Sequence, residues 1–467
     1  TGAADGYARM ADKPAAVLLH LGPGLGNGLA NLHNARKGHT PVVNIVGDHA
    51  TYHKQYDAQL ESDIETVARN VSSWLRTSAS VEEVAADAAD AVAVASGPPA
   101  QIATLILPAD VSWSEGGVPA SPVAPAEPTP VDADAVAAIA AVLQGDEPAA
   151  LFVGGRACRA EALVDASRVA NTTGAKLMAE TFPARIERGA GRVPVDRLAY
   201  LAEFAAMQLD GLKHLVLVDS KAPVSFFAYP GKASDLVPEG CTVHVLADQA
   251  GDPAAALAAL ADAVGAAPDA ATIQPEARPD LPSGPLTADG VCQALGALLP
   301  EGAIVSDEGN TSGLFAAGHT AGAPAHDWMT LTGGAIGQGL PAAVGAAVAC
   351  PDRQVIVLES DGSAMYTMQS WWTMAREELD VITVLFNNAS YAVLNMELNR
   401  VGATEGGPKA KEMLDLTRPT MDFVSMAQGC GVPATRATTA EEFIEQFQAA
   451  LAAKGPHVIE CIVPSII

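Results

Sequence analysis

Cysteine is scarce in this sequence and follows no pattern. The six cysteines lie far apart, and none belongs to a Cys-x-x-Cys pair or to a Cys/His cluster at zinc-ligand spacing. We therefore predict reduced thiols in the core and neither a disulfide framework nor a structural zinc site. No apolar run is long enough to span a bilayer, and the first residues lack a charged-then-apolar secretory pattern. A cytoplasmic location is the resulting expectation.

Positive charge is also scarce. The chain has 27 Lys and Arg against 54 Asp and Glu, which gives a formal net charge of -27 spread along its length. Nucleic acid and anionic membranes are therefore not expected as partners. Hydrophobic residues make up 49% of the 467 residues and charged residues only 17%, so the chain can bury a large core in several domains.

Three blocks of alternating strand and helix signals are separated by two proline-rich joints, at residues 118–131 and 266–285. The predicted domains are 1–117, 132–265 and 286–467. Short apolar runs bounded by glycine or proline predict buried parallel strands in each block, and the expected fold class is α/β with three doubly wound parallel-sheet domains. The predicted strands are 15–20, 41–46, 102–107, 149–153, 215–218, 242–246, 303–306, 354–358, 381–386 and 457–462.

The strongest chemical signal lies in the last block, where two polar segments each follow a predicted strand. Ser360-Asp361-Gly362-Ser363 follows one strand, and Asn388 closes the next one, 27 positions after Asp361. Either piece alone would be an ordinary turn. Together they place two oxygen ligands at the carboxyl ends of two strands, where open α/β sheets bind ligands and where Mg²⁺ finds the hard donors that it prefers.

This pair of segments resembles the diphosphate and magnesium motif of thiamine diphosphate (ThDP) dependent enzymes, the family of acetolactate synthase and benzoylformate decarboxylase. Ser360 replaces the first glycine of the motif, while the aspartate, the second glycine and both asparagines are present. The resemblance implies that Mg²⁺ binds the side chains of Asp361 and Asn388 and the carbonyl of Ser390. It further implies that Gly362 and Ser363 offer backbone amides to the diphosphate.

A glycine-rich loop at residues 331–339 leads into a helix with proline in its first turn. It is similar to the family segment in which one bulky aliphatic residue wedges between the two rings of ThDP. Ile336 occupies that place, and the Gly334 carbonyl would accept the pyrimidine amino group. By the same resemblance, residues 307–311, with Asn310 and Thr311, would line the diphosphate end.

The first block carries a strand, a tight turn and a helix start that resemble the family's Gly-Pro-Gly-x-x-Asn segment near the bound substrate, represented here by Gly24 and Asn27. His20 stands where benzoylformate decarboxylase carries a catalytic histidine. A structural, hydrogen-bonded histidine is the alternative. His49 follows the next strand and is a second candidate for proton transfer.

The stretch after the metal asparagines resembles the family segment whose side chains face the substrate, which includes Val393. It ends at Glu397, where benzoylformate decarboxylase has an aromatic residue. A carboxylate there would disfavour a phenyl group and could relay protons, so Glu397 is a third catalytic candidate. The alternative is that Glu397 lies on a solvated helix face.

The family's catalytic glutamate lies on the helix before the Ala-Asp-Gly-Tyr-Ala-Arg segment, which is matched here by residues 4–9. The resemblance therefore places this glutamate before Thr1, and we expect a polypeptide that starts at Thr1 to be a truncated one that binds ThDP poorly and turns over little or nothing. Since the family's site is shared between two subunits, a homodimer or tetramer is expected.

The predicted function is ThDP- and Mg²⁺-dependent decarboxylation and carboligation of small 2-oxo acids, as in acetolactate synthase. The alternatives are a non-ligating decarboxylase similar to benzoylformate decarboxylase, which His20 favours, and a non-catalytic ThDP-binding subunit. Gly154-Gly155-Arg156 shows no flavin signature, so FAD is not expected. A nicotinamide dehydrogenase is disfavoured because no strand is followed by Gly-x-Gly-x-x-Gly.

Overall fold

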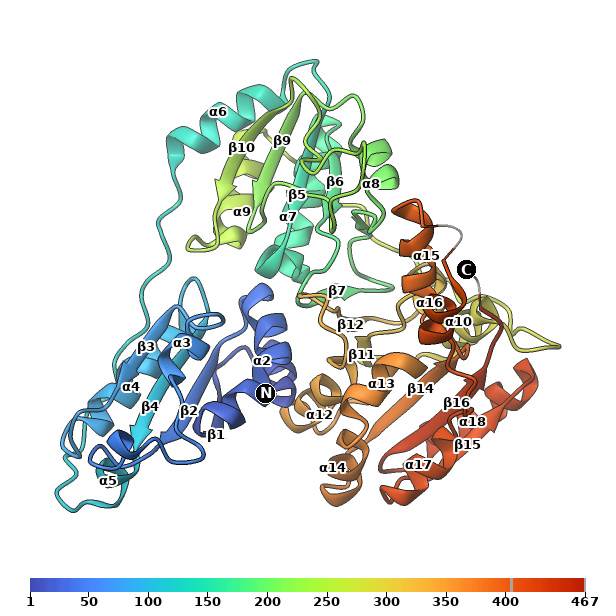
Figure 1. Ribbon diagram of the computed structural model, residues 1–467. Coiled ribbons are helices and arrows are strands. Elements are labelled where there is room, and N and C mark those ends of the chain that lie inside the picture. Colours follow the sequence, from blue (N-terminus) through green and yellow to red (C-terminus); the bar gives the residue numbers. More distant parts are fainter. Residues whose placement is uncertain (404–405, 466–467) are drawn as a thin grey trace. The chain divides into compact units, whose positions relative to one another are not determined.

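The computed structural model describes residues 1–403 and 406–465 and contains three sheets (Figure 1). The chain divides into two compact units, which are Thr1–Pro128 with Leu331–Cys350, and Thr129–Thr330 with Pro351–Ile467. Both proline-rich joints run without a helix or a regular strand. The three predicted domain ranges stay a prediction.

The first unit contains one four-stranded parallel sheet in the order β1-β2-β4-β3. Its strands are β1 (Ala15–His20), β2 (Val42–Asp48), β3 (Trp74–Thr77) and β4 (Ile102–Pro108). Its helices are α1 (Gly2–Ala11), α2 (Leu21–Lys37), η1 (Lys54–Tyr56), α3 (Ile64–Ala68), α4 (Val84–Ser96), α5 (Ala109–Trp113) and α12 (Gly339–Ala349). Because the strands are parallel, their carboxyl ends share one edge of the sheet.

The strand β1 differs from the expected buried strand. It is an edge strand of the described sheet, and its alternate residues Ala16, Leu18 and His20 are exposed, Leu18 by 79%. Its apolar sequence gave no sign of this, because an edge strand and a central strand can share the same composition.

Two glycines let α1 and α12 pack with their backbones in contact. A Cβ on Gly6 would lie 1.9 Å from the carbonyl oxygen of Ala342, and one on Gly345 would lie 1.9 Å from that of Ala3. These distances are far below van der Waals contact, so both positions require glycine.

The second unit begins with a five-stranded parallel sheet in the order β10-β9-β5-β6-β8. Leu151 and Val153 of β5 share a core with residues of α6, α7 and α9, whereas Ala150 and Phe152 share another core with residues of α8. Helices therefore cover both faces, as in a doubly wound sheet. The elements are α6 (Ala133–Leu143), β5 (Ala149–Val153), η2 (Gly155–Cys158), α7 (Ala160–Thr173), β6 (Lys176–Ala179), β8 (Asp196–Arg197), α8 (Ala202–Leu209), β9 (His214–Val218), β10 (Thr242–Ala247) and α9 (Pro253–Ala263).

The same unit contains a seven-stranded sheet in the order β15-β16-β14-β13-β11-β12-β7, parallel except for β7. Its strands are β7 (Ile186–Arg188), β11 (Ile304–Asp307), β12 (His326–Met329), β13 (Val355–Ser360), β14 (Val381–Asn387), β15 (Ala434–Ala437) and β16 (His457–Ile462). Its helices are α10 (Ala288–Leu298), η3 (Ser312–Phe315), α11 (Ala316–His319), α13 (Asp361–Thr367), α14 (Ser370–Arg376), α15 (Ala392–Arg400), α16 (Pro408–Leu414), α17 (Phe423–Gly429) and α18 (Ala440–Ala452).

The ten predicted strands are all present, and the predicted α/β class with doubly wound parallel sheets is confirmed. All six cysteines are free, but only three of them are buried, so the prediction of core thiols is wrong for Cys241, Cys350 and Cys430. Within the described residues, no helix combines the length and the apolar character needed to cross a bilayer.

Candidate functional site

The predicted metal ligands meet at one edge of the seven-stranded sheet. β13 and β14 are parallel neighbours with Ser360 paired to Phe386, so Asp361 and Asn388 both follow the carboxyl ends of adjacent strands. Asp361 is 2% exposed, while Asn388 is partly exposed. The structure thus brings together the two residues that the sequence separates by 27 positions.

Backbone amides surround the Asp361 carboxyl group. Its Oδ1 accepts a hydrogen bond from the amide of Gly362 at 2.8 Å, and its Oδ2 accepts one from the amide of Ala389 at 2.6 Å. Burial raises the pKa of Asp361 to about 6, and the hydrogen bonds from backbone amides oppose that shift. A cation beside this carboxylate would offset the free energy that its burial costs.

The turn after β14 contains Asn388 and Ser390, whose oxygen atoms are predicted metal ligands. Asn388 Oδ1 accepts from the amide of Ser390 at 3.0 Å, and Asn388 Nδ2 donates to Ser312 Oγ at 3.2 Å. Ala389 between them has a left-handed φ of 56°, which costs a residue with a Cβ about 1 kcal/mol. The turn therefore holds a strained shape that its hydrogen bonds maintain.

Close packing explains the glycine of the motif, Gly362, and hydrogen bonds explain its serine, Ser363. A Cβ on Gly362 would lie 2.4 Å from the Tyr391 ring, so glycine lets this ring pack on the start of α13. The Ser363 hydroxyl donates to the Glu359 carboxylate and, at 3.2 Å, to the carbonyl of Ser360. The amide of Gly362 donates to Asp361, so the contact of Gly362 and Ser363 with a diphosphate stays a prediction.

The predicted diphosphate-lining segment, residues 307–311, lies beside the 388–390 turn. Asp307 accepts from Trp328 Nε1 at 2.9 Å and from the amide of Gly309 at 3.2 Å, and burial raises its pKa. Asn310 has a left-handed φ of 43°, and Thr311 directly precedes η3. Since Ser312 receives the hydrogen bond from Asn388, the two segments form one polar edge.

The glycine-rich loop lies in the first unit and is held by polar side chains of α2. Asn34 Nδ2 donates to the carbonyl of Ala335 at 2.8 Å, and Asn34 Oδ1 accepts from its amide at 3.1 Å. Asn31 Nδ2 donates to the carbonyl of Gly337 at 3.1 Å, and His33 Nε2 lies 3.2 Å from that of Gly333. The loop's shape is therefore set by the helix that it contacts.

Sequence reasoning missed these loop-holding residues. Asn27, Asn31 and Asn34 recur at i, i+4 and i+7 along α2, which places three amides on one helix face and could have drawn attention to it. Gly334 and Gly337 both have positive φ, of 70° and 91°, as tight turns require. The predicted wedge residue Ile336 lies between these two glycines and is partly buried.

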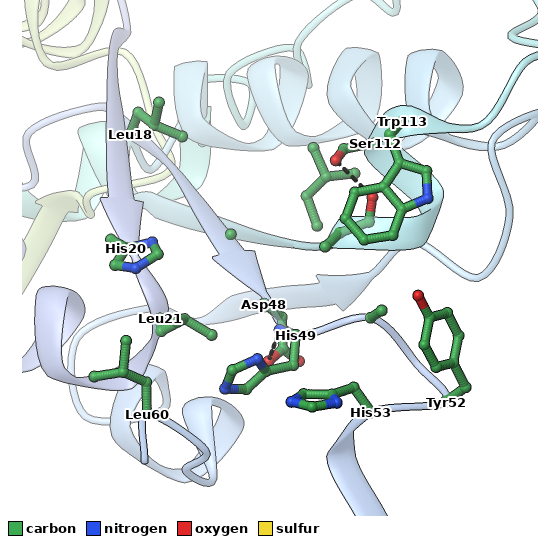
Figure 2. A pocket seen from close by; sticks show the side chains of 14 residues that line it. Leu18, His20, Leu21, Asp48, His49, Tyr52, His53, Leu60, Ser112 and Trp113 are labelled. Carbon is green, nitrogen blue, oxygen red and sulfur yellow. Dashed lines mark hydrogen bonds between the residues drawn. The ribbon is translucent and has the colours of Figure 1, made fainter. Parts of the chain in front are cut away.

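A pocket of about 670 Å³ at the carboxyl edge of the first sheet contains both predicted catalytic histidines (Figure 2). His20 ends β1 and His49 follows β2, and the rings of His49 and His53 lie 5.3 Å apart. His49 Nε2 is buried and has no hydrogen-bond partner within the described residues. The exposed side chains of Tyr52 and Trp113 also line the pocket. Gly24 and Asn27 lie further along α2 and are not among the lining residues.

Glu397 lies on α15, one turn beyond Val393, and is not on a solvated helix face. Its side chain is 15% exposed, and its Oε1 accepts from the hydroxyls of Tyr200 at 3.3 Å and Tyr229 at 3.1 Å. Its Oε2 lies 3.8 Å from Arg400 Nε. Desolvation is the larger cause of a raised pKa in both tyrosines, and the neighbouring Glu397 carboxylate raises the pKa further. Glu397 thus links α15 to Tyr200 in the segment after β8 and to Tyr229 in the loop after β9.

No three His, Cys, Asp or Glu side chains of the described residues gather as a metal-binding cluster. A metal at the 361–390 edge would therefore depend on a mixed set of one carboxylate, one side-chain amide and one backbone carbonyl.

Two models of a known protein family match parts of this chain. Residues 307–461 match the family model "Thiamine pyrophosphate enzyme, C-terminal TPP binding domain", and residues 1–68 match "Thiamine pyrophosphate enzyme, N-terminal TPP binding domain". A Mycobacterium tuberculosis protein named "Putative acetolactate synthase large subunit IlvX" is 60% identical over 473 residues, covering 100% of this chain and 90% of the relative. The benzoylformate decarboxylase of Pseudomonas aeruginosa is 31% identical over 498 residues, with 98% and 89% covered.

Solved structures give the same fold. The "putative thiamin diphosphate-dependent enzyme" of Mycobacterium smegmatis has a TM-score of 0.83 at 25% identity, covering 99% of this chain and 90% of that one. The 4-hydroxybenzoylformate decarboxylase of Rhodococcus jostii has a TM-score of 0.84 at 24% identity, again with 99% and 90% covered, and shows the fold alone.

The chain therefore belongs to the family of thiamine diphosphate-dependent enzymes. Within that family it is of the acetolactate synthase and benzoylformate decarboxylase type.

Proposed function

We propose that the protein catalyses ThDP- and Mg²⁺-dependent decarboxylation of small 2-oxo acids followed by carboligation, as an acetolactate synthase does. The observation that carries this proposal is the edge formed by Asp361 and the 388–390 turn on two adjacent parallel strands. The relative that is 60% identical bears an acetolactate synthase name, which supports the ligating branch.

The residues at this edge fit Mg²⁺. Asp361, Asn388 and the Ser390 carbonyl offer only hard oxygen donors, and a carboxylate that accepts two amide hydrogen bonds keeps lone pairs for a metal. Three protein ligands leave octahedral positions for diphosphate oxygens and water. Mg²⁺ would be held by these three groups and would neutralise the diphosphate.

ThDP, when bound, supplies a ring that stores the electron pair released by decarboxylation. The chain's own residues then have three tasks. The backbone of Gly362 and Ser363 would bind the diphosphate, Ile336 and the Gly334 carbonyl would hold the two rings, and His20 and His49 would move protons at the substrate. As in its family, we propose that the protein acts as a homodimer or tetramer, which sedimentation analysis would test.

A second candidate is a non-ligating decarboxylase similar to benzoylformate decarboxylase. The pocket that holds His20 and His49 favours it, because Tyr52 and Trp113 give the pocket an aromatic rim that would suit an aromatic side chain. The preferred substrate separates the two candidates.

The test is carbon dioxide release from pyruvate and from benzoylformate by the full-length gene product with ThDP and Mg²⁺. Asp361→Ala removes the only carboxylate of the ligand set, so we expect ThDP binding to lose its Mg²⁺ dependence and activity to fall at least 100-fold. Asp352→Ala is the matched control, because Asp352 is an exposed carboxylate just before the opposite end of β13.

Acetolactate formation from pyruvate would establish the ligating branch, and release from benzoylformate without ligation would establish the other. ThDP binding without release from either substrate would contradict both and leave a non-catalytic ThDP-binding subunit.

A further inference from the structure

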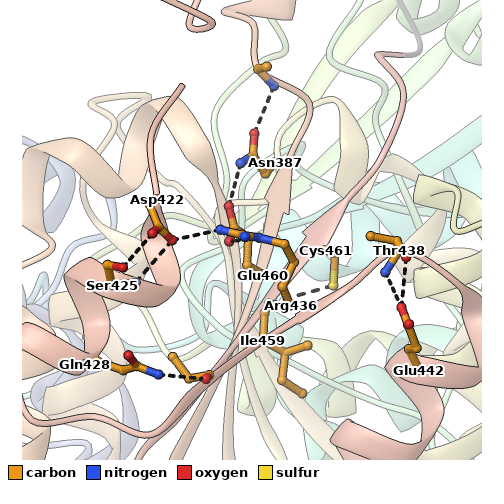
Figure 3. A network of polar contacts seen from close by, with 12 residues as sticks. Asn387, Asp422, Ser425, Gln428, Arg436, Thr438, Glu442, Ile459, Glu460 and Cys461 are labelled. Atoms are coloured by element: carbon orange, nitrogen blue, oxygen red, sulfur yellow. Dashed lines mark hydrogen bonds and ion pairs between the residues drawn. The ribbon is translucent and has the colours of Figure 1, made fainter. Parts of the chain in front are cut away.

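A buried carboxylate in the seven-stranded sheet has no part in the function proposed above. Glu460 lies on β16 between β14 and β15, is 0% exposed, and is paired in register with Leu385 and Arg436 (Figure 3). Burying a charge costs free energy that an apolar side chain at the same place would avoid. Its partners therefore indicate what Glu460 does.

Each oxygen of Glu460 has its own partner. Oε2 accepts from Arg436 Nε at 2.8 Å, and Oε1 accepts from Asn387 Nδ2 at 2.7 Å. The arginine compensates the charge, and the hydrogen bond that Arg436 donates to Glu460 raises the pKa of Arg436. Arg436 is 44% exposed and also donates to Asp422 at 2.8 Å, so the network reaches the surface on that side.

Glu460 fixes the orientation of the Asn387 side-chain amide. A carboxylate can only accept, so Asn387 must direct its NH₂ group at Glu460 and its Oδ1 the other way. That Oδ1 accepts from the amide of Ala389 at 3.1 Å, and the same amide donates to Asp361 Oδ2 at 2.6 Å. The polar chain thus runs from Arg436 through Glu460 and Asn387 to the turn that carries the metal ligands.

We propose that Glu460 is a positioning residue for Mg²⁺. By fixing the Asn387 amide, it holds Ala389 at its left-handed φ and keeps the Asn388 side chain and the Ser390 carbonyl in the arrangement that a metal requires. Glu460 lies on the strand next to β14 and is not one of the predicted metal ligands. This inference rests on the proposed function.

The test is Glu460→Gln in the full-length gene product. A glutamine places an NH₂ group where a carboxylate oxygen stood, so either Asn387 or Arg436 then faces another donor. We expect the affinity for Mg²⁺ at saturating ThDP, measured by titration calorimetry of the metal-depleted protein, to fall 10- to 100-fold, as for other residues that orient metal ligands.

Two further variants separate positioning from general stability. Thr383→Val removes another fully buried polar contact of β14, the hydrogen bond from Trp371 Nε1 at 3.3 Å, and should lower the melting temperature without changing the Mg²⁺ affinity. Adding Asn387→Asp to Glu460→Gln lets Gln donate to Asp and restores an acceptor for the Ala389 amide. The double variant should therefore recover Mg²⁺ affinity.

A Glu460→Gln variant with the Mg²⁺ affinity of the unmodified protein would overturn the inference. If that variant does not fold, Asn387→Asp alone, which sets a second carboxylate against Glu460, is compared with the double variant, and equal Mg²⁺ affinity in these two would overturn the inference. An unmodified protein that takes up no Mg²⁺ with ThDP would refute the proposed function itself.

Discussion

At the scale of single residues, Asn34 is the side chain on which the glycine-rich loop most depends. It is fully buried and satisfies both the amide and the carbonyl of Ala335, the residue between Gly334 and Ile336. One side chain that bonds both polar groups of a residue fixes the orientation of two successive peptide planes. The two residues predicted to hold the rings of ThDP are thereby placed by a residue outside their own loop.

We expect Asn34→Ala to weaken ThDP binding about 10-fold or more. The reason is the loss of its two buried hydrogen bonds to Ala335, of about 1 kcal/mol each. Fluorescence titration with ThDP at saturating Mg²⁺ would measure it. Asn171→Ala is the control, since it also removes two side-chain hydrogen bonds, to Ala270 and Thr272, but from α7. Equal ThDP affinity in both variants would show that Asn34 does not shape the site.

At the scale of elements, the crossing of α1 and α12 depends on the absence of two side chains. The carbonyls of Ala3 and Ala342 occupy the space that a methyl group on Gly345 or Gly6 would need. A backbone atom cannot rotate away as a side chain can, so either helix would have to move. The loop before α12 carries Gly334 and Ile336, and a displaced α12 would displace them.

Gly345→Ala should therefore destabilise the protein by about 1–3 kcal/mol through overpacking, although alanine favours helices. Gly26→Ala is the matched control, because Gly26 lies in α2 with open space at its Cβ position. That variant should be stabilised by about 0.5–1 kcal/mol through helix propensity. Urea denaturation of both proteins would measure the difference, and a stabilised Gly345→Ala would show that the helices do not cross so closely.

At the scale of the whole molecule, charge sets how stability responds to pH. The net charge of -27 means that repulsion within the fold grows as carboxyl groups ionise. Two carboxyls that directly follow strands of the five-stranded sheet add to this effect, the partly buried Glu180 after β6 and the buried Asp219 after β9. Burial raises the pKa of Glu180 to about 7 and that of Asp219 to about 6.

A folded-state pKa above the unfolded value means that the folded chain binds the proton more tightly. The resulting stability is complete below the ordinary glutamate pKa of 4.5 and is lost as pH rises through the folded-state pKa of about 7. Glu180→Gln keeps the acceptor for the Gly155 amide and removes this loss, so it should be more stable than the unmodified protein at pH 8, by about 3 kcal/mol at most.

The gain should shrink towards pH 5, and thermal unfolding at the two pH values would measure it. Glu161→Gln alters an exposed carboxyl on the adjacent α7 and should leave the pH profile unchanged. A gain from Glu180→Gln that did not depend on pH would show that this carboxyl does not titrate in the folded protein.

The sequence by itself determined ten of the strands and the residues of the predicted metal-binding edge. Apolar runs between glycine and proline located ten strands, most of them because burial on both faces demands apolar residues at every position, whereas β1 and β10 are apolar but partly exposed. Strands such as β3 and β15 were not predicted. They are short and partly exposed, so their composition is that of a loop. The Asp361 and Asn388 segments were visible because a turn after a strand is local in the chain.

Only the tertiary structure decided which distant groups act together. Asn34 bonds to Ala335 across 301 positions, and Glu397 bonds to Tyr200 across 197, and neither pairing leaves a local pattern. Likewise, Glu460 is a polar residue in a mostly apolar strand, and only the structure pairs it with Arg436 in register and with Asn387 through a hydrogen bond. The sequence directly shows the local alternation of apolar and polar residues. The hydrogen-bond partner of a buried polar group, in contrast, is fixed by packing between segments that are far apart in the sequence.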